Sequence, residues 1–457
     1  MRSKLQKFTT FANSLLPHET QYLLTHQALA DEERIAILKR IDFNCQHIEQ
    51  FTPYDETIDK RKYSHLKNWI EQRLRAIDVD VQYEWISALD HKIMTDSILP
   101  EDEQQLLKFI KNYQHPIFFF THFYELLQNY RQFLLVRMRY DDHESTNRFL
   151  KTYQAQYLHA KSIYEKLHLA TLDIVEQYKA ATAESRQWER WLTDIFYDEE
   201  LDGLNRYQAL IRLNFIAFNY RKFDTLLEKF IYLDQQFSAG QYYSKRLLLN
   251  YYGNRLLLHS KSRELERATY YGYLSIRAQN HDYLYYLTNL CAVLLRQNKH
   301  QEALKIMQQG AKAAKKTKNF HAKIGYIAFY TECQIACGNY KQAERYASTY
   351  LNVYNKEIKT YRWHLFFSAY LKSILQQYKY KVLITIIQHH RLLEKDKAYQ
   401  KKATYLPTIP WFHAVASYQE GILNKCELED ILKQFEQVED YNQYLLKDLL
   451  SLVRKHI

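Results

Sequence analysis

The scarcity of residues that interrupt helices constrains this chain more than any other feature. Only 8 glycines and 6 prolines occur in 457 residues. Glycine is absent before residue 203, and proline is absent between Pro116 and Pro407. Because proline ends helices, and because hairpin turns and phosphate-binding loops need glycine, the sequence predicts an almost entirely α-helical protein. The same scarcity argues against most nucleotide-binding folds.

The composition favours a folded protein with a large core. The hydrophobic fraction is 47%, and 41 tyrosines supply much of it, a residue type that suits half-buried positions in an elongated molecule. The net charge of +11 is compatible with nucleic acid, acidic lipid or an acidic protein surface as partner, but a solvated lysine-rich surface is the preferred interpretation. Five widely spaced cysteines indicate free thiols rather than a disulfide framework. No apolar run of secretory type follows the start, so we expect a cytoplasmic protein without a membrane span.

Residues 1–202 form the first predicted domain, an N-terminal set of helices. Helix starts are expected at Pro17, after Asp31 and at Pro100, because proline or an N-cap residue followed by acids is typical of a first helical turn. Two long helices are predicted over 118–140 and 147–178, separated by a polar break at 141–145. Residues 198–203 mark the boundary, since the first glycine occurs there.

A weak internal repeat follows this boundary and defines the second predicted domain, residues 203–404. Five stretches share a polar turn, then usually a large apolar or aromatic residue, then a small or apolar residue three positions later. The final positions, 226, 268, 303, 343 and 383, are 42, 35, 40 and 40 residues apart. This period is typical of stacked helix pairs, in which the ring lies between the two helices and the small residue lets them approach closely. Residues 405–457 are predicted to form C-terminal capping helices.

The best of these stretches resembles the tetratricopeptide-repeat family. Residues 338–346 read G-N-Y-K-Q-A-E-R-Y, which is similar to the family's turn and start of the second helix, and residues 298–304 match less closely. The resemblance covers residues 205–400, with spacings above the family's usual 34 and with its tryptophan and proline mostly missing. It implies an α-α superhelix of antiparallel helix pairs with somewhat longer helices. The N-terminal helices are expected to pack on the first pair and cap it, because residues 204–218 are too apolar for an exposed terminal helix.

No residue pattern predicts catalysis, a cofactor or a metal site. Cys333 and Cys337 lie one helical turn apart, but buried thiols explain them better than a zinc site does. The acidic segment 141–144 lacks the alternating oxygens and glycine of a calcium loop, so an inter-helix loop is preferred. Nucleotide-binding, hydrolase and metalloprotease motifs are all missing. We therefore expect a protein that is not an enzyme.

The predicted function is a scaffold that binds a peptide or protein partner in the concave groove of its repeats. If the first helix of each pair lines this groove, its exposed side chains are Tyr285, Thr288, Asn289, Arg296, Ser368 and Lys372. Two alternatives remain. The basic run from Lys312 to Lys323, with Lys315, Lys316 and Lys318 between them, is compatible with phosphate contacts of a nucleic-acid-associated protein, although a solvated helix face is preferred. The third class is a regulator in which the repeats sense a peptide.

Overall fold

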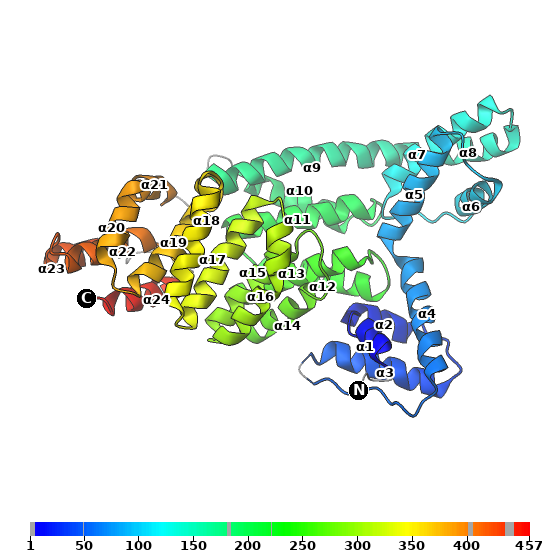
Figure 1. The fold of residues 1–457 in the computed structure, drawn as a ribbon. Coiled ribbons are helices and arrows are strands. Elements are labelled where there is room, and N and C mark those ends of the chain that lie inside the picture. The colour runs from blue at the N-terminus through cyan, green and yellow to red at the C-terminus, as the bar shows by residue number, and fades with distance from the viewer. Residues whose placement is uncertain (1–4, 49, 181–183, 221, 401–404, 435–442) are drawn as a thin grey trace. The chain divides into compact units, whose positions relative to one another are not determined.

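The computed structural model describes residues 5–48, 50–180, 184–220, 222–400, 405–434 and 443–457. These residues form 24 α-helices and one short 3-10 helix and contain no β-strand (Figure 1). The predicted all-α class is therefore confirmed. Contacts between residues divide the chain into two compact units, Met1–Asn254 and Arg255–Ile457, and the division falls inside α13 (Lys245–Lys261).

The first unit contains the elements up to the first half of α13. They are α1 (Gln6–Ala12), α2 (Pro17–Thr25), α3 (Glu32–Gln46), α4 (Lys60–Ile77), α5 (Val79–Met94), α6 (Pro100–Lys111), α7 (Phe120–Val136), α8 (Tyr140–Thr152), α9 (Gln154–Ala180), η1 (Arg186–Trp188), α10 (Glu189–Tyr197), α11 (Gly203–Tyr220) and α12 (Asp224–Ser238). The three predicted helix starts are confirmed at α2, α3 and α6. Asp31 caps α3 by accepting the backbone N–H groups of Glu33 and Arg34.

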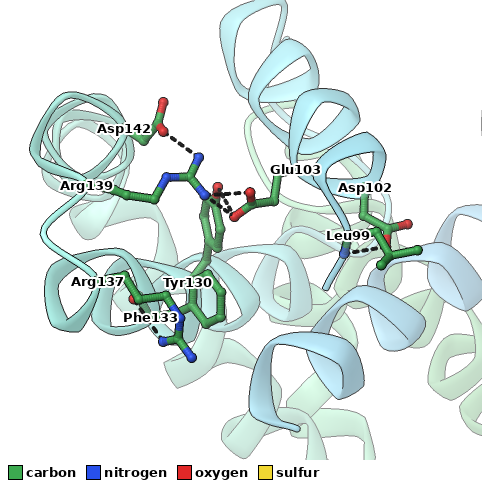
Figure 2. Close-up of polar contacts among 8 residues, drawn as sticks. All are labelled: Leu99, Asp102, Glu103, Tyr130, Phe133, Arg137, Arg139 and Asp142. Carbon is green, nitrogen blue, oxygen red and sulfur yellow. Dashed lines mark hydrogen bonds and ion pairs between the residues drawn. The ribbon is translucent and has the colours of Figure 1, made fainter. Parts of the chain in front are cut away.

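The predicted break at 141–145 is wrong, because these residues form the first turns of α8. The chain instead breaks at Arg137–Arg139 before α8 and at Tyr153 after it. A cluster of charges explains the difference (Figure 2). Arg139 binds Glu103 of α6 and, at 2.6 Å, Asp142 of α8, while the Tyr130 hydroxyl donates to Glu103 at 3.2 Å. Asp142 thus binds a cation, and both Asp141 and Asp142 lie at the positive end of the helix dipole.

Helices near the N-terminus pack on residues that follow position 203 within the first unit. His18 of α2 lies 2.6 Å from the Tyr252 hydroxyl and 2.8 Å from an Asp234 carboxylate oxygen. The Tyr243 hydroxyl donates to buried Glu19 at 2.7 Å. Helix α11, whose apolar residues predicted burial, packs on α9 and α10. These contacts agree with the expected packing on the first pair, whereas the domain boundaries at 203 and 405 remain predictions.

The second unit is an array of neighbouring helix pairs. Its elements are the second half of α13, α14 (Leu265–Ser275), α15 (Tyr283–Arg296), α16 (His300–Lys316), α17 (Phe320–Ala336), α18 (Tyr340–Thr360), α19 (Trp363–Leu375), α20 (Tyr380–His389), α21 (Leu392–Tyr399), α22 (Thr408–Gln419), α23 (Lys425–Lys433) and α24 (Gln443–Arg454). Helix α15 packs on α16, α17 on α18 and α19 on α20, and the first helices also pack on one another, α15 on α17 and α17 on α19 (Figure 1). This arrangement is compatible with a helical-repeat solenoid.

The turns inside these pairs repeat one backbone geometry. Arg263, Asn298, Gly338 and Tyr378 all have a positive φ of 58–78°. The residue after each donates its N–H five positions back, for example Lys299 to Leu294 at 2.9 Å and Asn339 to Gln334 at 2.8 Å. This is the Schellman cap, which satisfies the last carbonyl groups of a helix and reverses the chain. The turns expected from the sequence alignment are confirmed at these four positions.

The small residues that follow the turns lie inside the pairs, as expected. Ala268, Ala303 and Ala343 are fully buried, and each is the fourth residue of its second helix. Glycine has the same role at Gly310 of α16, where any side chain would overlap Leu287 of α15. At the other end of the unit α22 packs on α19 and α20 and buries Trp411 completely.

Candidate functional site

The six residues predicted to line a groove lie on α15 and α19, and α17 lies between these helices. Because α15 packs on α17 and α17 on α19, the three helices form one layer. Tyr285, Asn289 and Arg296 are spaced by four and seven residues on α15 and are partly exposed. Ser368 and Lys372 are partly exposed on α19. We call the partly exposed side of these three helices the first-helix face.

The expected exposure is wrong for Thr288. Only 3% of this residue is exposed, and its hydroxyl donates to the backbone carbonyl of Tyr285 at 3.0 Å. Its position is equivalent to Ala328, which precedes the next turn by the same ten residues and is also buried. At this offset the helix points at its neighbour in the layer, so a threonine there contacts the packing surface rather than solvent.

The other predicted residues bind neighbouring helices. Arg296 reaches the Ser260 carbonyl oxygen at 3.3 Å, and Lys372 Nζ lies 2.7 Å from the Glu332 carboxylate of α17. The Tyr285 hydroxyl lies 3.3 Å from His321 Nδ1. Ser368 has a buried hydroxyl with no hydrogen-bond partner among the described residues. Contacts between adjacent pairs therefore hold these side chains in place along the layer.

The structure adds α17 residues that sequence reasoning missed. Glu332 stands 40 residues before Lys372, and this is also the distance between the Gly338 and Tyr378 turns, so a strict use of the repeat period would have found it. His321 belongs to the first turn of α17, outside any offset used in the alignment. Burial, together with the smaller effect of the Arg362 charge, lowers the pKa of His321 to about 4, so the ring is neutral near pH 7.

The first-helix face carries polar side chains from three neighbouring helices. It presents a guanidinium, an ammonium group, a carboxylate, amides and hydroxyls on rigid helices, which are groups that bind polar and charged segments of a partner. Among the described residues no cluster of histidine, cysteine and acids could hold a metal ion. The face therefore offers hydrogen bonds and ion pairs from helix positions about 40 residues apart in the sequence.

The basic run is exposed only in part. Lys312, Lys315, Lys316 and Lys318 are exposed at the end of α16 and in the following turn. Lys323 is only 8% exposed, and its ammonium group lies 5.5 Å from the Phe320 ring and 5.1 Å from the Tyr354 ring. The hypothesis that Lys323 extends the basic stripe is therefore wrong, because cation–π contacts hold its side chain inside the unit.

The cysteines are free thiols, and those on neighbouring first helices contact one another. Cys291 of α15 and Cys333 of α17 are both fully buried, with their sulfur atoms 3.2 Å apart. Burial raises the pKa of Cys291, so its thiol stays protonated. Cys337 is half-buried, and burial raises its pKa as well. The interpretation of Cys333 as a core residue is supported by this packing.

Comparisons with known proteins leave the chain without an assigned family. No protein-family model matches it, and neither does any curated protein or solved structure. None of the helices in the described part of the chain combines the length and apolar character needed to cross a membrane.

Proposed function

We propose that this protein is a non-catalytic helical-repeat scaffold, similar in architecture to tetratricopeptide-repeat arrays, that binds a peptide or protein segment. One observation carries this proposal: the first helices α15, α17 and α19 pack directly on one another and present partly exposed polar side chains along one layer. Stacked helix pairs commonly use such a layer as an extended concave binding groove. The binding segment would lie across the three helices and contact Tyr285, Asn289, Arg296 and Lys372.

The chemistry of the face indicates the kind of segment. Arginine and tyrosine are the residue types that contribute most to binding at interfaces, and both occur on α15. The Lys372–Glu332 pair and the neutral His321 supply donors and acceptors without a large excess of either charge. We propose an extended segment with polar side chains as the ligand and the cytoplasm, which keeps thiols reduced, as the compartment.

Substituting Arg296→Gln and Lys372→Gln together should reduce recovery of the partner from a host lysate about tenfold or more, as judged by quantitative mass spectrometry. The thermal unfolding of the variant should change little, because a partly exposed ion pair such as Lys372–Glu332 contributes only about 0–1 kcal/mol to stability. The matched control is Lys305→Gln with Arg345→Gln, which removes two exposed cations from the second helices α16 and α18. Equal recovery with both double variants would exclude the first-helix face.

A second candidate function, association with nucleic acid, is favoured by the four exposed lysines between Lys312 and Lys318. It predicts binding that weakens by orders of magnitude between low and moderate salt, because phosphate contacts release counterions. A gel-shift experiment at about 50 mM salt checks this, with Lys312→Gln and Lys316→Gln as the variant. The absence of a shifted band at low salt would exclude binding to nucleic acid. The peptide-binding functions, as a scaffold or as a peptide sensor, would then remain.

A further inference from the structure

The first unit contains a pocket that the scaffold function does not use. Its volume is about 520 Å³, which lies in the range of small-molecule sites. Its wall is formed by the start of α5, residues 114–118, residues 199–206, the middle of α12 and the turn 240–242. Hydrogen bonds between distant backbone groups fasten this wall: Val79 N–H donates to the Tyr243 carbonyl at 2.8 Å, and Leu204 N–H donates to the Phe118 carbonyl at 3.0 Å.

One corner of the wall contains the glycine that caps α12, where Gln241 N–H donates to the Gln236 carbonyl at 2.8 Å, and a tyrosine with left-handed backbone. Gly240 and Tyr242 both have positive φ, 80° and 58°. Gly203 faces the same corner, and a Cβ atom there would stand 2.5 Å from the Phe118 ring and 3.1 Å from the Tyr242 ring. A residue other than glycine costs free energy when its backbone is left-handed, and such residues occur often at binding sites. The corner therefore holds Tyr242 in a fixed place on the pocket wall.

Arg206 is the cationic side chain that lines this pocket. Only 5% of the residue is exposed. Its Nε donates to the Phe196 carbonyl at 3.0 Å, and its Nη2 donates to the Tyr232 hydroxyl at 2.6 Å. The rings of Tyr232 and Tyr242 lie 5.8 Å and 5.5 Å from its Cζ. Neutral groups and ring faces thus hold the guanidinium in position.

The charge of Arg206 lacks a direct counter-charge. Within the part of the chain that the structure describes, it forms no ion pair, and its Nη1 makes no hydrogen bond although solvent can reach it. Glu199 also lines the pocket, but its carboxylate accepts from the Tyr232 hydroxyl at 3.1 Å and so is separated from Arg206 by that hydroxyl. A buried charge is costly unless it is paired. A bound acid group would supply the missing partner.

The remaining wall indicates what the acid group is attached to. Four glutamines line the pocket, and each offers a donor and an acceptor to an amide group of a ligand: Gln82, Gln114, Gln236 and Gln241. Ile117, Phe118 and Leu201 add apolar surface. Arg206 and Glu199 give the wall one positive and one negative charge, and burial lowers the pKa of His115, so a monoanion fits better than a dianionic phosphate.

We propose that this pocket binds a carboxylate on an amide-bearing, partly apolar body, with the carboxylate paired to Arg206 Nη1 and the amides hydrogen-bonded to the glutamines. An N-acylated amino acid and the C-terminus of a peptide share this chemistry. The proposal concerns the first unit alone and does not rest on the first-helix face of the second unit.

The test is isothermal titration of the full chain with four probes at about 100 mM salt. They are N-acetyl-L-leucine, its uncharged amide, the tripeptide N-acetyl-Ala-Ala-Leu with a free carboxylate, and inorganic phosphate. We expect the leucine acid to bind about tenfold or more tightly than its amide, because hydrogen bonds to charged groups are the strong ones. A tripeptide that binds more tightly than the single amino acid indicates a peptide C-terminus, whereas equal affinity indicates a small acid.

Two substitutions at adjacent positions of α12 distinguish the effect of a charge inside the pocket from the effect of a charge just outside it. Gln236→Glu places a carboxylate on the pocket wall and should weaken binding of the leucine acid about tenfold or more. Gln235→Glu makes the same change on the next residue, which is exposed and outside the wall, and should alter affinity by less than about threefold. Both keep Arg206 and the two hydrogen bonds that hold its side chain.

The proposal is overturned if the amide binds as well as the acid, if phosphate binds better than either acid, or if the two glutamine variants behave alike. Failure of both acids to bind at about 10 mM would overturn it as well.

Discussion

Replacing Leu287 by alanine is expected to lower the free energy of unfolding by about 2–5 kcal/mol, the range typical of buried leucines. Leu287 is fully buried on α15 and lies against Gly310 of α16. The side chain thus fills the space that the missing Cβ of Gly310 leaves between the two helices of the pair. Urea denaturation followed by circular dichroism measures the loss, and the partly exposed Leu445→Ala on α24 serves as the control, with an expected change of about 0.5 kcal/mol.

The same contact makes a second substitution informative. Gly310→Ala alone should destabilise the protein by about 1–3 kcal/mol, because the new methyl group overlaps Leu287. In the double variant, however, the smaller side chain at 287 makes room for this methyl group. The double variant should therefore lose less stability than the two single variants lose together. Strict additivity would show that the two helices do not depend on this contact for their close approach.

The helix pairs were predictable because local signals and packing agree there. Gly338 and Asn298 mark turns, and the buried Ala303 and Ala343 mark positions where the helices approach. A periodic pattern in the sequence therefore corresponds to a periodic structure. The break at 141–145 was wrong because clustered acids are compatible with a loop as well as with a first helical turn. In the folded chain Asp142 pairs with Arg139, and Arg139 is held in place by a second ion pair with Glu103 of α6, which no local sequence pattern shows.

The candidate sites were less predictable because they depend on contacts between elements. Thr288 was assigned to the surface from its offset alone, and the neighbouring helix in the layer covers it. The pocket around Arg206 was missed entirely, since its wall joins residues from positions 79 to 242 that share no sequence pattern. A buried arginine cannot be told from an exposed one by sequence, and the absence of an ion pair is visible only in the fold.

Asp202 gives the first unit a pH-dependent stability. This residue precedes α11 and is only 1% exposed. One carboxylate oxygen accepts the backbone N–H of Asn205 at 3.0 Å, and the other accepts its side-chain amide at 2.8 Å. These bonds favour the charged form, but burial outweighs them and raises the pKa of Asp202 from 3.8 to about 6. The folded state therefore holds a proton that the unfolded chain releases at lower pH.

We expect the stability difference between Asp202→Asn and the natural chain to depend on pH between about 4 and 6. In this window the unfolded carboxyl has lost its proton while the folded one keeps it, so raising the pH favours unfolding of the natural chain. At 1.36 kcal/mol per pKa unit, a shift of about two units amounts to roughly 3 kcal/mol. Asparagine keeps one of the two acceptor oxygens that bind Asn205, replaces the other by an NH2 group, and does not titrate, so any pH-independent cost of the lost bond leaves the pH dependence unchanged. The free energy of unfolding of the variant should therefore rise by up to about 3 kcal/mol relative to that of the natural chain between pH 4 and pH 6. Above pH 6 this difference should stay constant. Urea denaturation at five pH values measures this difference. A difference that stays constant with pH, or that shrinks as pH rises, would show that the pKa of Asp202 is not raised in the folded protein.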